Sequence, residues 1–239
     1  MLTTILTRNL TWDAANSTWK VGSKFGSADT DTFANGDTAI FGALSDATEE
    51  VTIDGAVEAE SVSIAAGADK TYSFISANGG KLTTSTLEIG AGTAVFGADT
   101  LNIGALSAVT VDGVLDVVAL SAGQDTSSLM KKLAAATGSG TVKIGGGWAT
   151  IDDADTIQFS VDIEADDAIE ILRNNGSMEW NVANSITVTD GTGSKNGDVL
   201  VGRHVNLNVQ DGGVIDAEGA IKLGNSDWVP VLWVAILPW

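Results

Sequence analysis

Val51-Thr-Ile-Asp-Gly55 is a short unit in which apolar and polar side chains alternate ahead of a glycine, and it returns as Val109-Thr-Val-Asp-Gly113. A second unit, Thr86-Leu-Glu-Ile-Gly90, returns as Thr100-Leu-Asn-Ile-Gly104. Alternation of this kind is typical of a β-strand, because successive side chains point to opposite faces of a sheet. Units that repeat along a chain predict short strands that stack to bury a shared apolar face.

The spacing of the units gives an expected coil length. The interval from Val51 to Val109 accommodates about three coils of roughly 19 residues each. The interval from Thr86 to Thr100 is shorter than one such coil, so either the coils vary in length or that echo joins two different strands. Glycine is frequent, at 28 residues, and proline is scarce, at 2, which fits strands separated by turns. The sequence therefore predicts an all-β solenoid.

One segment departs from the strand pattern. Residues Ser127–Thr137 carry good helix formers, begin with a candidate serine cap and are followed by Gly138 as a stop signal. We expect one short helical insert on the stack. The predicted organisation is an N-terminal capping segment at 1–50, a β-solenoid at 51–227 and an apolar C-terminal tail at 228–239.

Composition excludes several classes of function. The 31 Asp and Glu outnumber the 12 Lys and Arg, and the resulting charge of −19 repels nucleic-acid phosphates and anionic lipid. The chain has no cysteine and one histidine, so disulfides, thiolate metal sites and templates that need several imidazoles do not apply. We expect no cofactor and no nucleic-acid partner.

The two ends of the chain bear on location and assembly. Residues 1–9 lack the long apolar stretch of a signal peptide, so an exported form would need a signal that this sequence does not show. The tail Trp228–Trp239 is apolar but too short to cross a bilayer. We expect no membrane insertion, a tail that packs on the last coil, and a homodimer contact through it, since a large apolar patch is unusual on a monomer.

Three strings follow one another in the first part of the chain: Leu10-Thr-Trp-Asp-Ala-Ala-Asn-Ser-Thr-Trp19, Thr32-Phe-Ala-Asn-Gly-Asp-Thr-Ala-Ile-Phe41 and Val51-Thr-Ile-Asp-Gly-Ala-Val-Glu-Ala-Glu-Ser-Val-Ser-Ile64. In this order they resemble the autotransporter-associated β-strand repeat proteins. The resemblance covers residues 10–64 and is only compositional from residue 120 onward. It implies a secreted or surface-displayed bacterial protein with a right-handed parallel β-helix, as in passengers and surface adhesins, and it implies no shared catalytic site.

Aromatic and acidic side chains are the candidates for a site. Trp12 and Trp19 offer faces on which a sugar ring could stack, although a structural role at the open end of the stack is favoured. Close carboxylates can divide into an acid and a base, which makes five residues catalytic candidates. They are Asp152, Asp153, Asp155, Asp166 and Asp167. In a chain with 31 acidic residues, solvated turns are the favoured interpretation of these groups.

Two Asn-Gly-Asp strings are candidate cation sites. They end at Asp37 and Asp198, and each precedes an apolar run closed by glycine. Calcium sites of this kind need several adjacent copies, so that neighbouring coils share the carboxylates. A plain turn, in which asparagine and glycine tolerate positive φ, is favoured, and no metal is expected.

The expected function is adhesion. A non-enzymatic, secreted or surface-displayed β-helix would offer a long rigid face to host glycoprotein or glycan. The alternative is an acid-active hydrolase of glycoproteins, either an aspartic-type protease or a glycosidase that uses paired carboxylates. An aspartic protease would normally show Asp-Thr-Gly or Asp-Ser-Gly, whereas the chain offers Asp29-Thr-Asp-Thr and Asp190-Gly-Thr-Gly.

Overall fold

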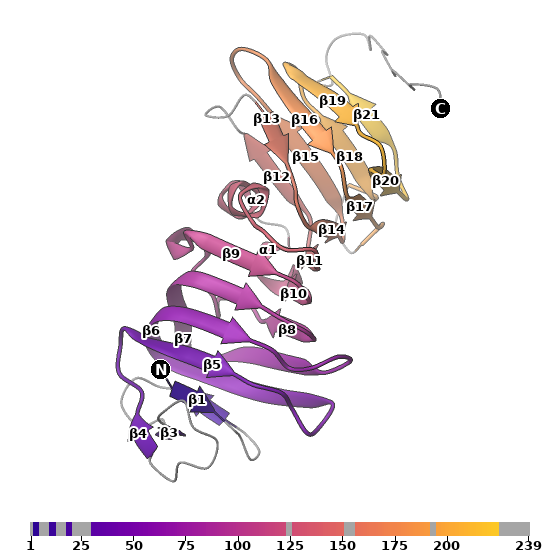
Figure 1. The fold of residues 1–239 in the computed structure, drawn as a ribbon. Helices are drawn as coiled ribbons and strands as arrows, with labels where there is room; N and C mark the ends of the chain where they lie inside the picture. Colours follow the sequence, from indigo (N-terminus) through magenta and orange to yellow (C-terminus); the bar gives the residue numbers. More distant parts are fainter. Residues whose placement is uncertain are drawn as a thin grey trace.

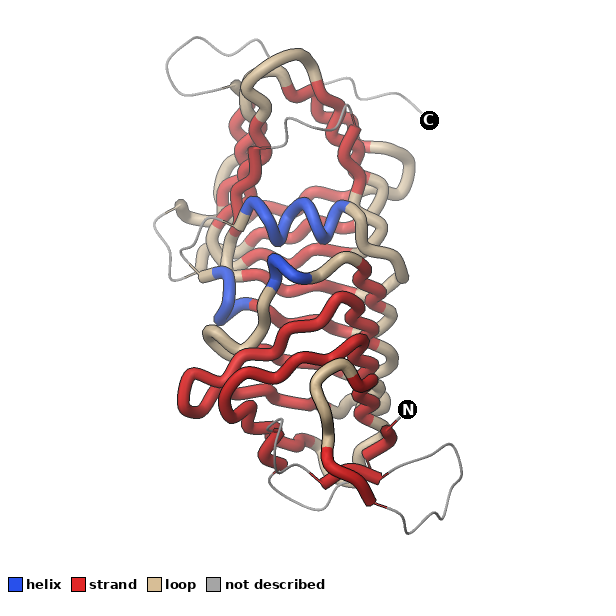
Figure 2. Tube along the Cα trace, turned by 90° about the vertical axis from the view of Figure 1, so that its left-hand side faces the viewer, coloured by secondary structure: helices blue, strands red, loops and turns tan. Residues whose placement is uncertain are grey.

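The computed structural model describes residues 2–4, 10–12, 18–20, 30–122, 126–150, 156–191 and 195–224. Strands dominate these residues, and successive coils lie parallel to one another along one column (Figures 1 and 2). The column has about eight turns. The predicted all-β, parallel β-solenoid is therefore confirmed.

One sheet of twelve strands runs the length of the column, and all its pairings are parallel. Its strands are β1 (Leu2–Thr4), β2 (Leu10–Trp12), β5 (Asp37–Phe41), β6 (Thr48–Ile64), β7 (Thr71–Ile89), β8 (Thr93–Phe96), β9 (Ala108–Val111), β10 (Val114–Val117), β11 (Thr141–Ile144), β14 (Asp162–Ala165), β17 (Ser185–Val188) and β20 (Val214–Ala217). Three of these, β1, β2 and β5, fall within the predicted capping segment 1–50 and pair in the same sheet as the coils that follow.

Two further parallel sheets join the long one in the C-terminal half (Figure 1). The first contains β12 (Gly147–Thr150), β15 (Ala168–Leu172), β18 (Asp198–Val201) and β21 (Ile221–Leu223). The second contains β13 (Thr156–Gln158), β16 (Met178–Val182) and β19 (Val205–Val209). An antiparallel pair, β3 (Thr18–Lys20) with β4 (Thr30–Thr32), lies near the N-terminal end.

The coils are longer than the sequence predicted. One turn of the chain leads from a residue to its partner on the next coil. In the strand ladders from β5 onward, the turn from Ala94 to Leu115 is among the shortest, and the turn from Ile169 to Val199 is the longest. The expected length of roughly 19 residues is shorter than any of these turns. The reason is that Val51 pairs with Phe74 whereas Val109 pairs with Leu87, so the repeated units belong to different rows of the sheet.

Interior side chains stack in register from coil to coil. One row runs Tyr72, Ala94, Leu115, Val142, Ile163, Ile186 and Ile215. The first six are at most 2% exposed. Each large aliphatic side chain buried in this way contributes roughly 1.5–3 kcal/mol. The rows are the main source of cohesion between coils.

Aromatic rings fill the interior toward the N-terminal end. The rings of Phe74 and Phe96 stack with their centroids 4.7 Å apart and 10° between their planes. Phe41 meets Phe74 edge-on at 5.1 Å and Tyr72 at 5.3 Å. The hydroxyl of Tyr72 donates a hydrogen bond to the carbonyl oxygen of Gly42 at 2.9 Å. The buried phenol is thereby provided with a partner.

Backbones of neighbouring coils approach closely at Gly80. A Cβ at this position would lie 1.8 Å from the carbonyl oxygen of Ile53. No side chain fits at that distance, so the contact requires glycine.

The predicted helical insert is present as α2 (Ser127–Ala134). It stops before Thr137, because Thr137 forms a β-bridge with Thr110 of β9. Leu129, Met130 and Leu133 are its buried side chains, and the helix packs on β9 and β12. A short helix α1 (Val118–Ser121) and a 3-10 turn η1 (Ile103–Ala105) lie nearby, and the helical segments gather midway along the column (Figure 2).

The last described coil carries large apolar side chains that are exposed to solvent. Val209, Val214 and Ile221 are 49%, 51% and 47% exposed, one on each of β19, β20 and β21. The predicted tail 228–239, and the homodimer contact assigned to it, lie outside the described residues. Within the described ranges, no helix is long and apolar enough to span a bilayer.

Candidate functional site

The structure places Trp12 in the core. Its side chain on β2 is fully buried, and its ring meets Phe33 at 5.2 Å and Phe41 at 5.4 Å between centroids, both edge-on. A ring in this position is inaccessible to a sugar, and Trp12 serves the packing of the first coils. Trp19 lies on β3, and its side chain is outside the described part of the chain.

Two of the five candidate catalytic carboxylates lie at the corner between β14 and β15. Asp166 accepts a hydrogen bond from the hydroxyl of Thr189 at 3.3 Å, and Asp167 accepts one from the backbone N–H of Lys195 at 2.9 Å. Both bonds connect one coil to the next, which is the behaviour of turn residues. The other three candidates fall in the undescribed segment 151–155: Asp152, Asp153 and Asp155.

The first Asn-Gly-Asp string forms a turn ahead of β5. Gly36 has a φ of 93°, and the carboxylate of Asp37 accepts a hydrogen bond from the backbone N–H of Ala34 at 3.0 Å. This is a local turn contact, which matches the favoured interpretation of the string.

The second string also forms a turn, with φ of 58° at Asn196 and 73° at Gly197. Asp198 is nearly buried; it accepts a hydrogen bond from the backbone N–H of Ala220 at 2.8 Å and forms an ion pair with Lys222. The hydrogen bond from Lys222, followed by that from Ala220, lowers the pKa of Asp198. Across the described ranges, no group of three or more His, Cys, Asp or Glu is placed to hold a metal ion.

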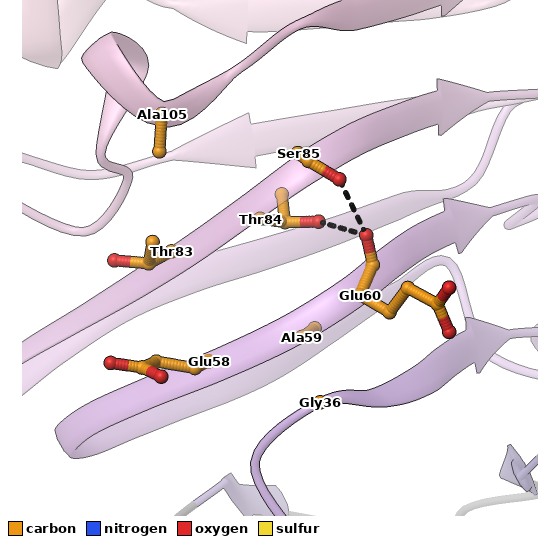
Figure 3. Close-up of a pocket in the computed structure, with 8 residues that line it drawn as sticks. All are labelled: Gly36, Glu58, Ala59, Glu60, Thr83, Thr84, Ser85 and Ala105. Carbon is orange, nitrogen blue, oxygen red and sulfur yellow. Dashed lines mark hydrogen bonds between the residues drawn. The ribbon is translucent and has the colours of Figure 1, made fainter.

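A hollow on the side of the N-terminal half is the candidate binding site. Its volume is about 270 Å³, slightly below the range of roughly 300–1,000 Å³ that is typical for drug-sized ligands. It spans four successive segments of the column, from the turn before β5 through β6 and β7 to η1 (Figure 3). Its lining residues are Gly36, Glu58, Ala59, Glu60, Thr83, Thr84, Ser85 and Ala105.

A β-bulge in β6 lies beside the hollow. Asp37 of β5 pairs with Ala59, but Thr38 pairs with Ser61, so Glu60 is an extra residue opposite β5. A bulge interrupts the ladder of backbone hydrogen bonds, bends its strand and re-aims the side chain at that position. The bulge thus lies at the hollow, where Glu60 is one of the lining residues.

On its other edge, β6 pairs Ala59 with Thr84 and Ser61 with Thr86 but skips Glu60, and hydroxyl groups of β7 contact the backbone at that position. The carbonyl oxygen of Glu60 accepts hydrogen bonds from the hydroxyls of Ser85 at 3.0 Å and Thr84 at 3.5 Å, as Figure 3 shows. On the other side, the backbone N–H of Gly36 donates to the carbonyl oxygen of Glu58 at 2.9 Å, and Asn35 Oδ1 accepts from the backbone N–H of Glu58 at 3.2 Å. The backbone around the hollow is thus fixed by internal hydrogen bonds.

The carboxylates of Glu58 and Glu60 stand on opposite sides of Ala59 in Figure 3. Both side chains are exposed, and neither carboxylate makes an ion pair or hydrogen bond within the described part of the chain. Small side chains at Ala59 and Ala105 leave room for a ligand to approach the backbone. Chemically, the hollow offers hydrogen-bond acceptors and hydroxyls around a small apolar floor.

Sequence reasoning missed this site, although one signal was present. The alternation in Val57-Glu-Ala-Glu60 places both glutamates on one face of a strand. The hydroxyl residues that complete the hollow lie on another strand, since Ala59 pairs with Thr84, one turn further along the chain. Neither that register nor the bulge could be derived from the alternation.

Comparison with known proteins finds no relative of this chain. No family model, no curated protein and no solved structure matches the chain.

Proposed function

We propose that the protein is a non-catalytic binding module, displayed outside a bacterial cell, that holds a glycan in the hollow between β6, β7 and η1. The observation that carries the proposal is the pair of exposed carboxylates, Glu58 and Glu60, beside the hydroxyls of Thr83 and Ser85. A sugar presents several hydroxyl groups close together, and a carboxylate can accept hydrogen bonds through both of its oxygens.

The rigidity of the site supports this proposal. Its residues lie on strands and turns whose backbone is held by the hydrogen bonds described above, so a ligand would not have to order a loop. Hydrogen bonds to charged groups contribute roughly 1.5–3 kcal/mol each, and one shallow site without an aromatic ring gives an affinity on the order of millimolar. Such an affinity suits adhesion through many copies rather than tight capture by one.

Extracellular display is supported by two properties of the chain. The charge of −19 favours solubility and discourages side-by-side association. Residues 10–64 resemble autotransporter-associated repeats, whose members are displayed on bacterial surfaces. A parallel β-solenoid is also a stiff support that keeps a site away from its point of attachment.

Glycan binding is tested by screening the purified protein against immobilised glycans and measuring the hits by calorimetry. The Ala105→Trp variant fills the hollow, as its Cβ points into it (Figure 3), and should weaken binding at least ten-fold. Glu88→Gln is the matched control, because Glu88 is an exposed carboxylate of β7 outside the lining, and it should bind as the parent does.

Two results would contradict the proposal. One is the absence of glycan binding at millimolar concentrations, and the other is binding that Ala105→Trp leaves unchanged. Product analysis over pH 3 to 8 examines the hydrolase alternative in the same samples. If cleavage occurs and disappears when one carboxylate is substituted, the function is catalysis rather than binding.

A further inference from the structure

We infer that the hollow selects sugars that carry a free amine and rejects sialylated or sulfated ones; this inference rests on the proposed function. The reason lies in the charges of the lining. Among its eight residues, Glu58 and Glu60 are the two charged ones, and both are acidic. The remaining six contribute hydroxyls, methyl groups and backbone.

The surroundings of the hollow reinforce this charge. Asp37 follows Gly36 directly at the start of β5, and its carboxylate is engaged with a backbone N–H rather than with a cation. The lysine nearest in sequence to the lining, Lys81, pairs with Ala56 and is not part of the lining. A negatively charged ligand would meet two like charges in the lining itself.

The geometry also fits an ammonium group. Glu58 and Glu60 are both exposed on β6, and their side chains point away from each other on either side of Ala59 (Figure 3), so each carboxylate would meet a separate amine of the ligand. An ammonium group has three donors and no acceptor, which matches carboxylates that accept from nothing else in the described structure. Neutral sugars can use the hydroxyls, but they leave the charge of these carboxylates uncompensated.

The size of the preference can be estimated. Exposed ion pairs contribute roughly 0.2–1 kcal/mol each, so two of them favour an amine-bearing sugar over its neutral counterpart by about two- to thirty-fold. Because exposed charges are screened by salt, the preference should fall strongly between low salt and molar salt.

The test compares two probes with the same sugar backbone and length: a glucosamine oligomer, whose amines are free, and its fully N-acetylated counterpart, whose amines are neutral amides. Calorimetry at pH 6 and low ionic strength should give about ten-fold tighter binding of the glucosamine oligomer. The Glu58→Gln/Glu60→Gln variant should bind both oligomers equally, and Glu88→Gln should keep the preference. Circular dichroism checks that these exposed, isosteric variants are folded.

The outcomes separate the two proposals. Equal binding of the two oligomers overturns the amine selectivity and leaves glycan binding in place. A preference that persists in the double glutamine variant also overturns it, because the acidic surface as a whole would then be responsible. Tighter binding of a sialylated oligosaccharide than of the N-acetylated oligomer likewise overturns the amine selectivity. Failure of all three probes and of the wider glycan screen overturns the proposed function itself.

Discussion

The ionisation of Tyr72 gives a direct measure of the interior of the solenoid. Tyr72 is the single tyrosine of the chain, is 2% exposed, and donates its hydroxyl to the carbonyl oxygen of Gly42. Burial, with a smaller contribution from the charge of Glu49, raises the pKa of its phenol from 10.0 to about 12. This difference corresponds to roughly 3 kcal/mol of preference for the neutral phenol in the folded protein.

The sign of the effect on stability follows from the raised pKa. The contribution of Tyr72 is fully present below pH 10, the value for the unfolded chain, and is lost as the pH rises toward 12. We therefore expect the folded protein to show no tyrosinate at pH 10.5. Ionisation should occur near pH 12, or together with unfolding if the fold gives way first.

The measurement is an alkaline titration of tyrosinate absorbance, with circular dichroism recorded on the same samples. Protein in concentrated urea should titrate near pH 10, and Tyr72→Phe supplies the blank because it removes the one tyrosine. Half-ionisation near pH 10 while the β-sheet signal is intact would refute the burial of Tyr72, and with it the register of the row in which it lies.

Three further predictions concern the packing and the turns. Phe74→Ala should lower the free energy of unfolding by about 3–5 kcal/mol in urea titrations, because it empties a fully buried position in the aromatic stack. Gly80→Ala should lower the thermal midpoint markedly, since its Cβ would overlap a backbone carbonyl of the neighbouring coil, whereas Gly104→Ala, with its nearest contact at 3.5 Å, should change it little. Asp198→Asn should destabilise the protein at pH 7, and its difference from the parent should shrink below about pH 4, because a lowered pKa stabilises the fold only where the carboxylate is ionised. An unchanged difference at pH 3 would assign the effect to packing rather than to the ion pair with Lys222.

The fold class could be predicted because its signals are local. Alternation within short units closed by glycine identifies strands and turns wherever they fall in a column. The helix at Ser127 was equally local, and it begins within one residue of the predicted start, although Thr126 and not the predicted serine stands at the N-cap position. Its predicted end at Thr137 was wrong, because the bridge of Thr137 to β9 is a tertiary contact.

The register could not be predicted, because similar strands occur at several places in each coil. The unit at Val51 and the unit at Val109 look alike, yet they pair with Phe74 and Leu87 and belong to different rows. The echo between Thr86 and Thr100 likewise joins different strands, which was one of the two explanations left open.

The candidate site was even harder to predict from the sequence than the register. Trp12 is large and apolar, a property shared by sugar platforms and core residues alike, and only the contacts with Phe33 and Phe41 decide between them. Glu58 and Glu60 did not stand out among 31 acidic residues until the bulge and the register placed them beside the hydroxyls of β7.

The pairing of each coil with its immediate neighbours has a consequence for how the molecule assembles. Contacts between paired strands from β5 onward never reach back further than one turn of the chain, and the longest such turn separates Ile169 from Val199. Each turn therefore needs only the preceding turn as a template, and folding can propagate along the axis without contacts from distant parts of the polypeptide. Such a molecule can be lengthened or shortened by whole turns, and damage at one level should spread to adjacent levels before it reaches the far end.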